Sequence, residues 1–80
     1  MELKKRDINK LIKLKTVRLA KYVQRRDNIK WNEALIKIAG TKTYECLQNE
    51  NTAYYLESDE YIWNQYELEL AGNWEEWRKL

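Results

Sequence analysis

Side chains that could do covalent chemistry are few in this sequence. It has one cysteine, Cys46, and one serine, Ser58, and it has no histidine to act as a base near neutral pH. Neither residue lies in a motif typical of an activated nucleophile. We therefore predict that the protein is not an enzyme. Cys46 is interpreted as a small core residue, because free cysteines are among the most buried residues.

Ligands for a metal or a cofactor are equally sparse. Glu57, Asp59 and Glu60 form a short acidic group, but they lack the alternating oxygen spacing of a calcium loop. We expect them to be the solvated start of a helix. One cysteine without histidine excludes a zinc site of the usual type within one chain, and no glycine-rich phosphate loop is present. The sequence thus predicts no metal and no cofactor.

Charge is divided between the two parts of the chain. Residues 1–30 hold 11 Lys or Arg and 3 Asp or Glu, a net +8, whereas residues 31–80 hold 4 and 10, a net −6. A surface of one sign attracts opposite charge over about 8 Å at physiological salt. The two parts therefore either pair with each other, within one chain or between two, or bind a charged partner.

Eighty residues with no proline and two glycines favour one small all-α domain of about four short helices. The expected division is a basic amphipathic helix over 7–26, short helices over 31–71 and a Trp-rich tail over 73–80. Asp7 is the expected N-cap of the first helix. Leu14 and Val17 depart from its apolar stripe and share its basic face. The stripe contains Ile8, Leu11, Ile12, Leu19, Tyr22 and Val23.

Cap residues predict where the shorter helices begin and end. Gly40 is expected in a left-handed conformation after a helix that starts at Trp31, and Gly72 after the last helix. Thr41 is the expected N-cap of a helix that ends near Leu47, and Ser58 that of the last helix, which runs to about residue 71. The apolar positions expected to face inward are Trp31, Ala34, Leu35, Ile38, Ala39, Tyr44, Leu47, Ile62, Trp63, Tyr66 and Leu70.

The basic helix raises the hypothesis of nucleic-acid binding, because cations on one helix face suit phosphate contacts. An ordinary solvated surface, or pairing with the acidic part of the same chain, explains the same charges. The candidate residues for nucleic-acid binding are Lys10, Lys13, Arg18, Lys21 and Arg25.

Aromatic residues favour binding to another protein. Four Trp and six Tyr are many for 80 residues, and both types are enriched in interface cores. Trp74 and Trp77 follow the last helix stop and share one face at a spacing of three residues. They are the predicted protein-binding residues. The alternative is that they fold back as a lid over a thin core.

Three segments resemble a group of very short, uncharacterised bacterial helical proteins of the mobile-element or toxin-associated type. They are residues 31–35 (WNEAL), 42–47 (KTYECL) and 52–58 (TAYYLES), and the similarity extends over about residues 17–70. The chain departs from this group at Lys30, where a capping Ser or Thr is usual, and in its Trp-rich tail. The resemblance implies a helical, non-enzymatic accessory protein.

Together these patterns predict a binding or inhibitor module that acts by stoichiometric contact, in the manner of an antitoxin or of a phage or mobile-element accessory protein. A protein partner is favoured. Binding of nucleic acid through residues 1–30 and a self-associating structural module, such as a homodimer, are the alternatives. The chain begins without a signal peptide and has no apolar run near the ~20 residues of a membrane span, so we expect a cytoplasmic protein without membrane contact.

Overall fold

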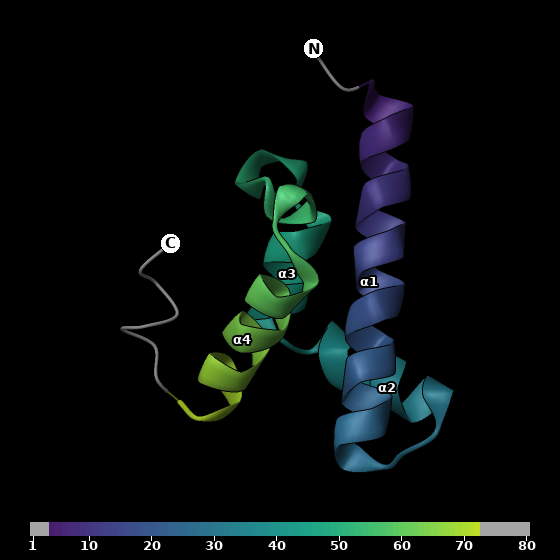
Figure 1. Ribbon diagram of the computed structural model, residues 1–80, viewed down its shortest axis with the longest axis vertical. Coiled ribbons are helices and arrows are strands. Elements are labelled where there is room, and N and C mark those ends of the chain that lie inside the picture. Colours follow the sequence, from purple (N-terminus) through teal and green to yellow (C-terminus); the bar gives the residue numbers. More distant parts are fainter. Residues whose placement is uncertain (1–3, 73–80) are drawn as a thin grey trace.

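The computed structural model describes residues 4–72, and this part of the chain folds into helices without any strand (Figure 1). The all-α prediction is therefore confirmed for it. None of its helices combines the length and apolar character needed to cross a membrane. The elements are α1 (Lys5–Asp27), α2 (Trp31–Ala39), α3 (Lys42–Gln48), the 3-10 turns η1 (Glu50–Thr52) and η2 (Tyr54–Leu56), and α4 (Asp59–Leu70).

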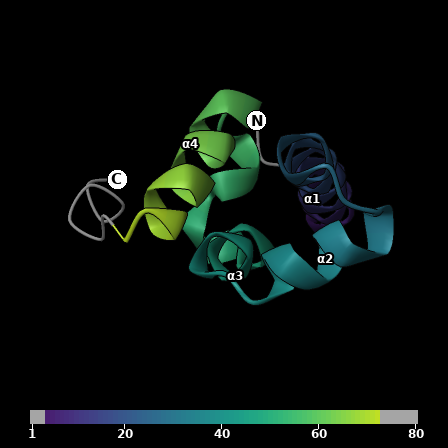
Figure 2. The same cartoon turned by 90° about the horizontal axis from the view of Figure 1, so that it is seen from below.

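The long helix α1 is the element against which the others assemble. Figure 2 looks nearly along its axis and shows α2, α3 and α4 gathered around part of its circumference. The rest of that circumference has no neighbouring helix. Helices α1 and α4 run in the same direction, because Lys15 contacts Asp59 at the start of α4 and Arg26 contacts Glu67 near its end. The connection through α2 and α3 makes this parallel arrangement possible.

The core is the apolar stripe of α1 covered by the shorter helices. Leu19, Ala20 and Val23 are completely buried, and so are Ile38 on α2 and Leu47 on α3. The apolar residues whose spacing predicted the inner faces of α1 and α4 contribute side chains to this core. The complete buried apolar set is Ile12, Leu19, Ala20, Val23, Ala34, Ile38, Leu47, Tyr54, Tyr55, Ile62 and Tyr66.

The start of α1 differs from the prediction. The helix begins at Lys5, and Lys4 is its N-cap without a side-chain hydrogen bond. Asp7 lies in the first turn, so its assignment as N-cap was wrong. It still lies where the helix dipole favours negative charge, and the basic residues before it have sufficient helix propensity to extend the helix. At the other end α1 continues through Asp27 into Asn28, which takes the left-handed conformation (φ 54°).

The glycine that follows α2 also behaves differently from the prediction. Gly40 has φ −88° and is not left-handed, because α3 starts two residues later and the chain does not reverse there. Gly72 does adopt a positive φ, 73°, as predicted for the end of α4. Ala53 adopts φ 58° between the two 3-10 turns, a conformation that is uncommon without glycine or asparagine.

Side-chain caps follow the sequence closely at the other helix starts. The Thr41 and Ser58 hydroxyls accept from the backbone N–H groups of Tyr44 and Tyr61, both at 3.1 Å, which confirms both predicted N-caps. Helix α2 has no such cap, because the Lys30 side chain cannot accept a hydrogen bond. Here the Glu33 carboxylate accepts from the Lys30 backbone N–H at 3.1 Å.

One cap comes from a different helix. The Glu69 carboxylate of α4 accepts from the backbone N–H groups of Lys42 (2.6 Å) and Thr43 (2.8 Å), and from the Thr43 hydroxyl at 2.8 Å. These N–H groups belong to the first turn of α3, where no partner exists within the helix. The carboxylate also complements the positive end of the α3 dipole. Glu69 therefore fixes α4 to α3.

Several positions expected to face inward are less buried than the periodicity indicated. Leu35 and Trp63 are half-buried, Ala39 is exposed, and Trp31 and Leu70 are exposed by 37% and 42%. Trp31 is the first residue of α2 and Leu70 the last of α4, and the ends of these short helices extend beyond the surface that α1 can cover. Tyr44 and Cys46 are half-buried and pack against the core. Cys46 was expected to be a buried core residue and lies instead at the edge of the core.

Truncation of Ile62 to Ala should lower the free energy of unfolding by about 2–5 kcal/mol, because it leaves a cavity in the core. The matched control is Ile36→Ala on α2, where the side chain is 73% exposed and the loss should stay below about 0.5 kcal/mol. Urea unfolding followed by circular dichroism measures both. Equal losses would contradict the assigned core.

Replacement of Glu69 by Ala should cost about 1.5–3 kcal/mol, because hydrogen bonds to a charged group are strong and three of them, from Lys42 and Thr43, are removed. Glu45→Ala is the control, since Glu45 is exposed and its one ion pair within residues 4–72 is with Lys42, at 3.6 Å. Its loss should cost below about 0.5 kcal/mol. The same unfolding experiment compares them. A Glu69 variant as stable as the Glu45 variant would refute the capping role.

Candidate binding surface and adjoining pocket

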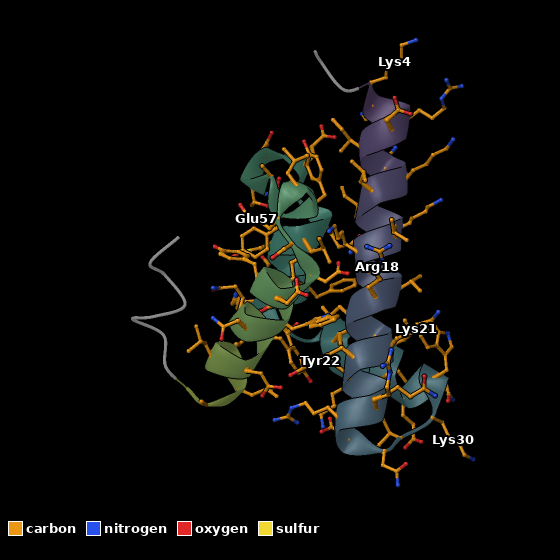
Figure 3. The ribbon with its side chains drawn as sticks, viewed as in Figure 1. Lys4, Arg18, Lys21, Tyr22, Lys30 and Glu57 are labelled. Carbon is orange, nitrogen blue, oxygen red and sulfur yellow. The ribbon has the colours of Figure 1, made fainter. Side chains whose placement is uncertain are left out.

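The side of α1 that faces away from the core carries a continuous basic surface. Its residues recur at spacings of three and four, which places them on one helix face. Figure 3 shows Lys21 extending from α1 on the side away from α4, while Tyr22 points towards α4. We call this surface the outward face of α1. All of its members are exposed: Lys10, Lys13, Leu14, Val17, Arg18, Lys21 and Arg25.

Three cations of α1 form ion pairs with carboxylates of α4. Asp59 on α4 binds both Lys15 and Arg18, each at 3.2 Å. Glu67 on α4 binds Arg26 at 2.5 Å. Residues 41 to 44 positions apart in the sequence form these pairs, so the predicted pairing between the basic and acidic parts occurs within one chain.

Four of the five candidate nucleic-acid-binding residues remain outside this pairing. Lys10, Lys13, Lys21 and Arg25 have no ion-pair partner within residues 4–72, whereas the fifth, Arg18, is held by Asp59. The structure therefore brings the five residues onto one helix but leaves only four as uncompensated cations.

Two apolar side chains lie in the middle of these cations. Leu14 is 42% exposed and Val17 is 38% exposed, so neither is packed into the core, as their departure from the apolar stripe indicated. Single exposed apolar residues are ordinary. This pair is distinguished by its place at the centre of a cationic helix face, which is the distribution of an interface with an apolar centre and a polar rim.

A second feature lies in the seam between α1 and α4. The rings of Tyr22 and Trp63 are stacked, with centroids 4.9 Å apart and planes 8° from parallel. The edge of Tyr66 meets Tyr22 at 6.5 Å. The Tyr22 hydroxyl donates a hydrogen bond to the Glu67 carboxylate, which also accepts from Nε of Arg26. These contacts fix the Tyr22 ring and the Arg26 guanidinium in position.

The ionisation of this seam follows from its contacts. The hydrogen bond from Arg26 is the main reason that the pKa of Glu67 is lowered, and the Tyr22 hydroxyl adds to it. Burial, and then the neighbouring Glu67, raise the pKa of Tyr22. Burial raises the pKa of Tyr66 to about 12. At neutral pH the Glu67 carboxylate and the Arg26 guanidinium are therefore charged, and the Tyr22 and Tyr66 phenols are neutral.

A pocket of about 430 Å³ opens at this seam. It is lined by Tyr22, Arg25 and Arg26 of α1 and by Trp63 of α4. Its volume lies in the range of small-ligand pockets. The sequence alone does not reveal this pocket, because its walls come from two helices that are distant in the chain. The spacing of Tyr22 and Arg26, four residues apart on one face, was the available signal.

The side chains that could act as a nucleophile or as metal ligands do not lie together in the described part of the chain. Cys46 is half-buried, and burial raises the pKa of its thiol, which makes it a poorer nucleophile. Within residues 4–72 no cluster of three or more acidic or thiol side chains is arranged to hold a metal ion. The predicted protein-binding residues Trp74 and Trp77 lie outside the described residues.

Comparisons with known proteins give no match: no family model, no curated protein and no solved structure is similar to this chain. Function must therefore be inferred from the outward face of α1 and from the pocket.

The seam predicts how stability depends on pH. A carboxylate whose pKa is lowered by folding stabilises the native state above its unfolded pKa, ~4.3 for Glu, and this contribution is lost as pH falls through the folded value. Glu67→Gln should therefore be less stable than the parent at pH 7, and the difference should shrink below about pH 4. Urea midpoints measured between pH 3 and 7 test this.

Glu57→Gln is the control for this series, because Glu57 is exposed and has no ion pair within the described chain. It should follow the parent at every pH. A constant difference between Glu67→Gln and the parent over the whole range would show that the carboxylate charge is not what stabilises the seam.

Proposed function

We propose that this protein is a non-enzymatic binding module that acts by stoichiometric contact with an acidic protein, and that it does so through the outward face of α1. The observation that carries the proposal is the placement of two exposed apolar residues, Leu14 and Val17, among cations without an ion-pair partner within residues 4–72. An acidic rim around an apolar groove is the complementary surface. Helices commonly dock in such grooves through residues spaced by three and four.

The dimensions of the face support such docking. Lys10 and Arg25 are fifteen residues apart on one helix, which corresponds to ~22 Å at 1.5 Å per residue. The cations at its edges would attract an acidic partner and accelerate association, and the apolar centre would supply interface core. The resemblance to mobile-element and toxin-associated proteins favours an antitoxin or inhibitor role within this class.

Nucleic-acid binding is the second candidate, supported by the four candidate residues, Lys10, Lys13, Lys21 and Arg25, that have no ion-pair partner in the described chain. It explains the apolar centre less well, because Leu14 and Val17 would be pressed against phosphates that they cannot contact favourably. Self-association through two copies of this face is disfavoured, since a two-fold interface would bring like charges together.

The test starts from the protein that copurifies with the full chain from its native cells, remixed in pure form at 1:1. Leu14→Ser combined with Val17→Ser should weaken binding at least tenfold, or about 1.4 kcal/mol. Lys10→Glu combined with Lys21→Glu should mainly slow association and reduce its salt dependence. Ile36→Ser, on the exposed side of α2, is the control and should bind like the parent.

A nucleic-acid arm uses a 20-base-pair DNA duplex and a single-stranded RNA of the same length, titrated over a range of salt. If phosphate contact is the function, log affinity falls with log salt by ~0.9 per duplex phosphate neutralised. Submicromolar binding that is lost in the Lys10 and Lys21 variant and unchanged in the Leu14 and Val17 variant would replace our proposal with the second candidate.

A further inference from the structure

The pocket between α1 and α4 has two kinds of wall. One is aromatic, formed by the stacked rings of Tyr22 and Trp63. The other is cationic, formed by Arg25 and Arg26. The two arginines follow Tyr22 by three and four positions, so they lie one helical turn beyond its ring on α1. A surface suited to a planar ring and a surface suited to an anion therefore adjoin in one pocket.

The aromatic wall is held in place by the protein itself. The Tyr22 hydroxyl is bound to the Glu67 carboxylate, and the edge of Tyr66 packs against the Tyr22 ring. Tyr22 and Trp63 are nevertheless only half-buried, and both contribute surface to the pocket. A ligand ring that packs against them gains aromatic contact without first having to order the protein side chains, a cost that weakens many binding sites.

The charge of the pocket is carried by Arg25. Arg26 binds Glu67 and Asp27, and Asp27 also binds Lys37 at 2.6 Å, so these two carboxylates are matched by two cations. Arg25 is exposed and has no ion-pair partner within residues 4–72. A guanidinium binds a phosphate or a carboxylate through two parallel N–H groups. The position left for an anion is therefore beside Arg25.

We propose that this pocket is a binding site for a small aromatic anion, in which a planar ring packs on the wall of Tyr22 and Trp63 and an adjoining phosphate or carboxylate binds Arg25. Both parts of the ligand are needed. A ring alone leaves Arg25 unpaired, and an anion alone meets an exposed arginine, where ion pairs contribute little. The inference does not rest on the proposed function, because Leu14 and Val17 do not line the pocket.

The test is a nuclear magnetic resonance titration of the full-length, isotope-labelled chain. The Trp63 indole N–H signal, one of four, is assigned with Trp63→Phe. The probes are adenosine monophosphate and indole-3-acetate, which join a planar ring to a phosphate and to a carboxylate. Adenosine and indole-3-acetamide are their uncharged counterparts, and inorganic phosphate and acetate are the anions alone.

We expect at least one of the two probes to shift the Trp63 signal at submillimolar concentration and to bind at least tenfold more tightly than its uncharged counterpart. Nuclear Overhauser contacts should join the ligand ring to the rings of Trp63 and Tyr22. Inorganic phosphate and acetate should leave the Trp63 signal unchanged. The tighter of the two probes identifies the anionic group of the ligand.

Variants of α1 and α4 separate the two walls. Arg25→Ala should weaken binding of the charged probe at least tenfold and leave binding of its uncharged counterpart unchanged. Lys13→Ala is the matched control, because Lys13 is an exposed cation of α1 that does not line the pocket. Trp63→Leu should weaken both ligands, with affinity measured from the Tyr22 backbone amide. Since Trp63 packs against the core, circular dichroism checks that this variant is folded, and the Arg25 and Lys13 pair decides if it is not.

Three results would overturn the proposal. One is that neither probe shifts the Trp63 signal even at millimolar concentration. Another is that the charged and uncharged ligands bind equally well, because Arg25 would then have no part in recognition. The third is that shifts are confined to the backbone amides around Lys10 and Lys13, because the anion would then be attracted to the outward face of α1 and not to the pocket.

Discussion

Burial of one apolar stripe of α1 is the interaction on which the rest of the structure depends. Helices α2, α3 and α4 have 9, 7 and 12 residues, and helices of these lengths are marginal or unstable alone in water. Each becomes stable by packing on the same neighbour. Ile38, Leu47 and Ile62 meet in one cluster with Leu19 and Val23. Because the short helices occupy only this side, α1 retains a second, solvated side along its length.

The carboxylates of α4 determine how much basic charge remains on that second side. Asp59 and Glu67 neutralise cations near the seam, and Glu69 turns away to cap α3. Within residues 4–72 the acidic side chains therefore do not pair with all of the basic ones. They order the seam between α1 and α4 and leave the outward face charged. The same residues that stabilise the fold thus define the surface available to a partner.

Much of this architecture followed from the sequence because its signals are local. Thr41 and Ser58 cap helices through hydrogen bonds that span three residues, and the stripe of α1 is visible in its own periodicity. Three features depend on which helices become neighbours: the cap supplied by Glu69, the two ion pairs of Asp59 and the pocket beside Trp63. The residue pattern of a single helix does not indicate its neighbours. Gly40 was misassigned for a related reason, since the conformation after α2 is set by where α3 must begin.

The parallel arrangement of α1 and α4 affects how the chain is made. Lys15 and Asp59 are 44 positions apart, so α1 is synthesised before the residues that cover its seam. At ~5–20 residues per second this interval lasts on the order of seconds. During it, the nascent chain exposes both the apolar stripe and the basic face of a helix.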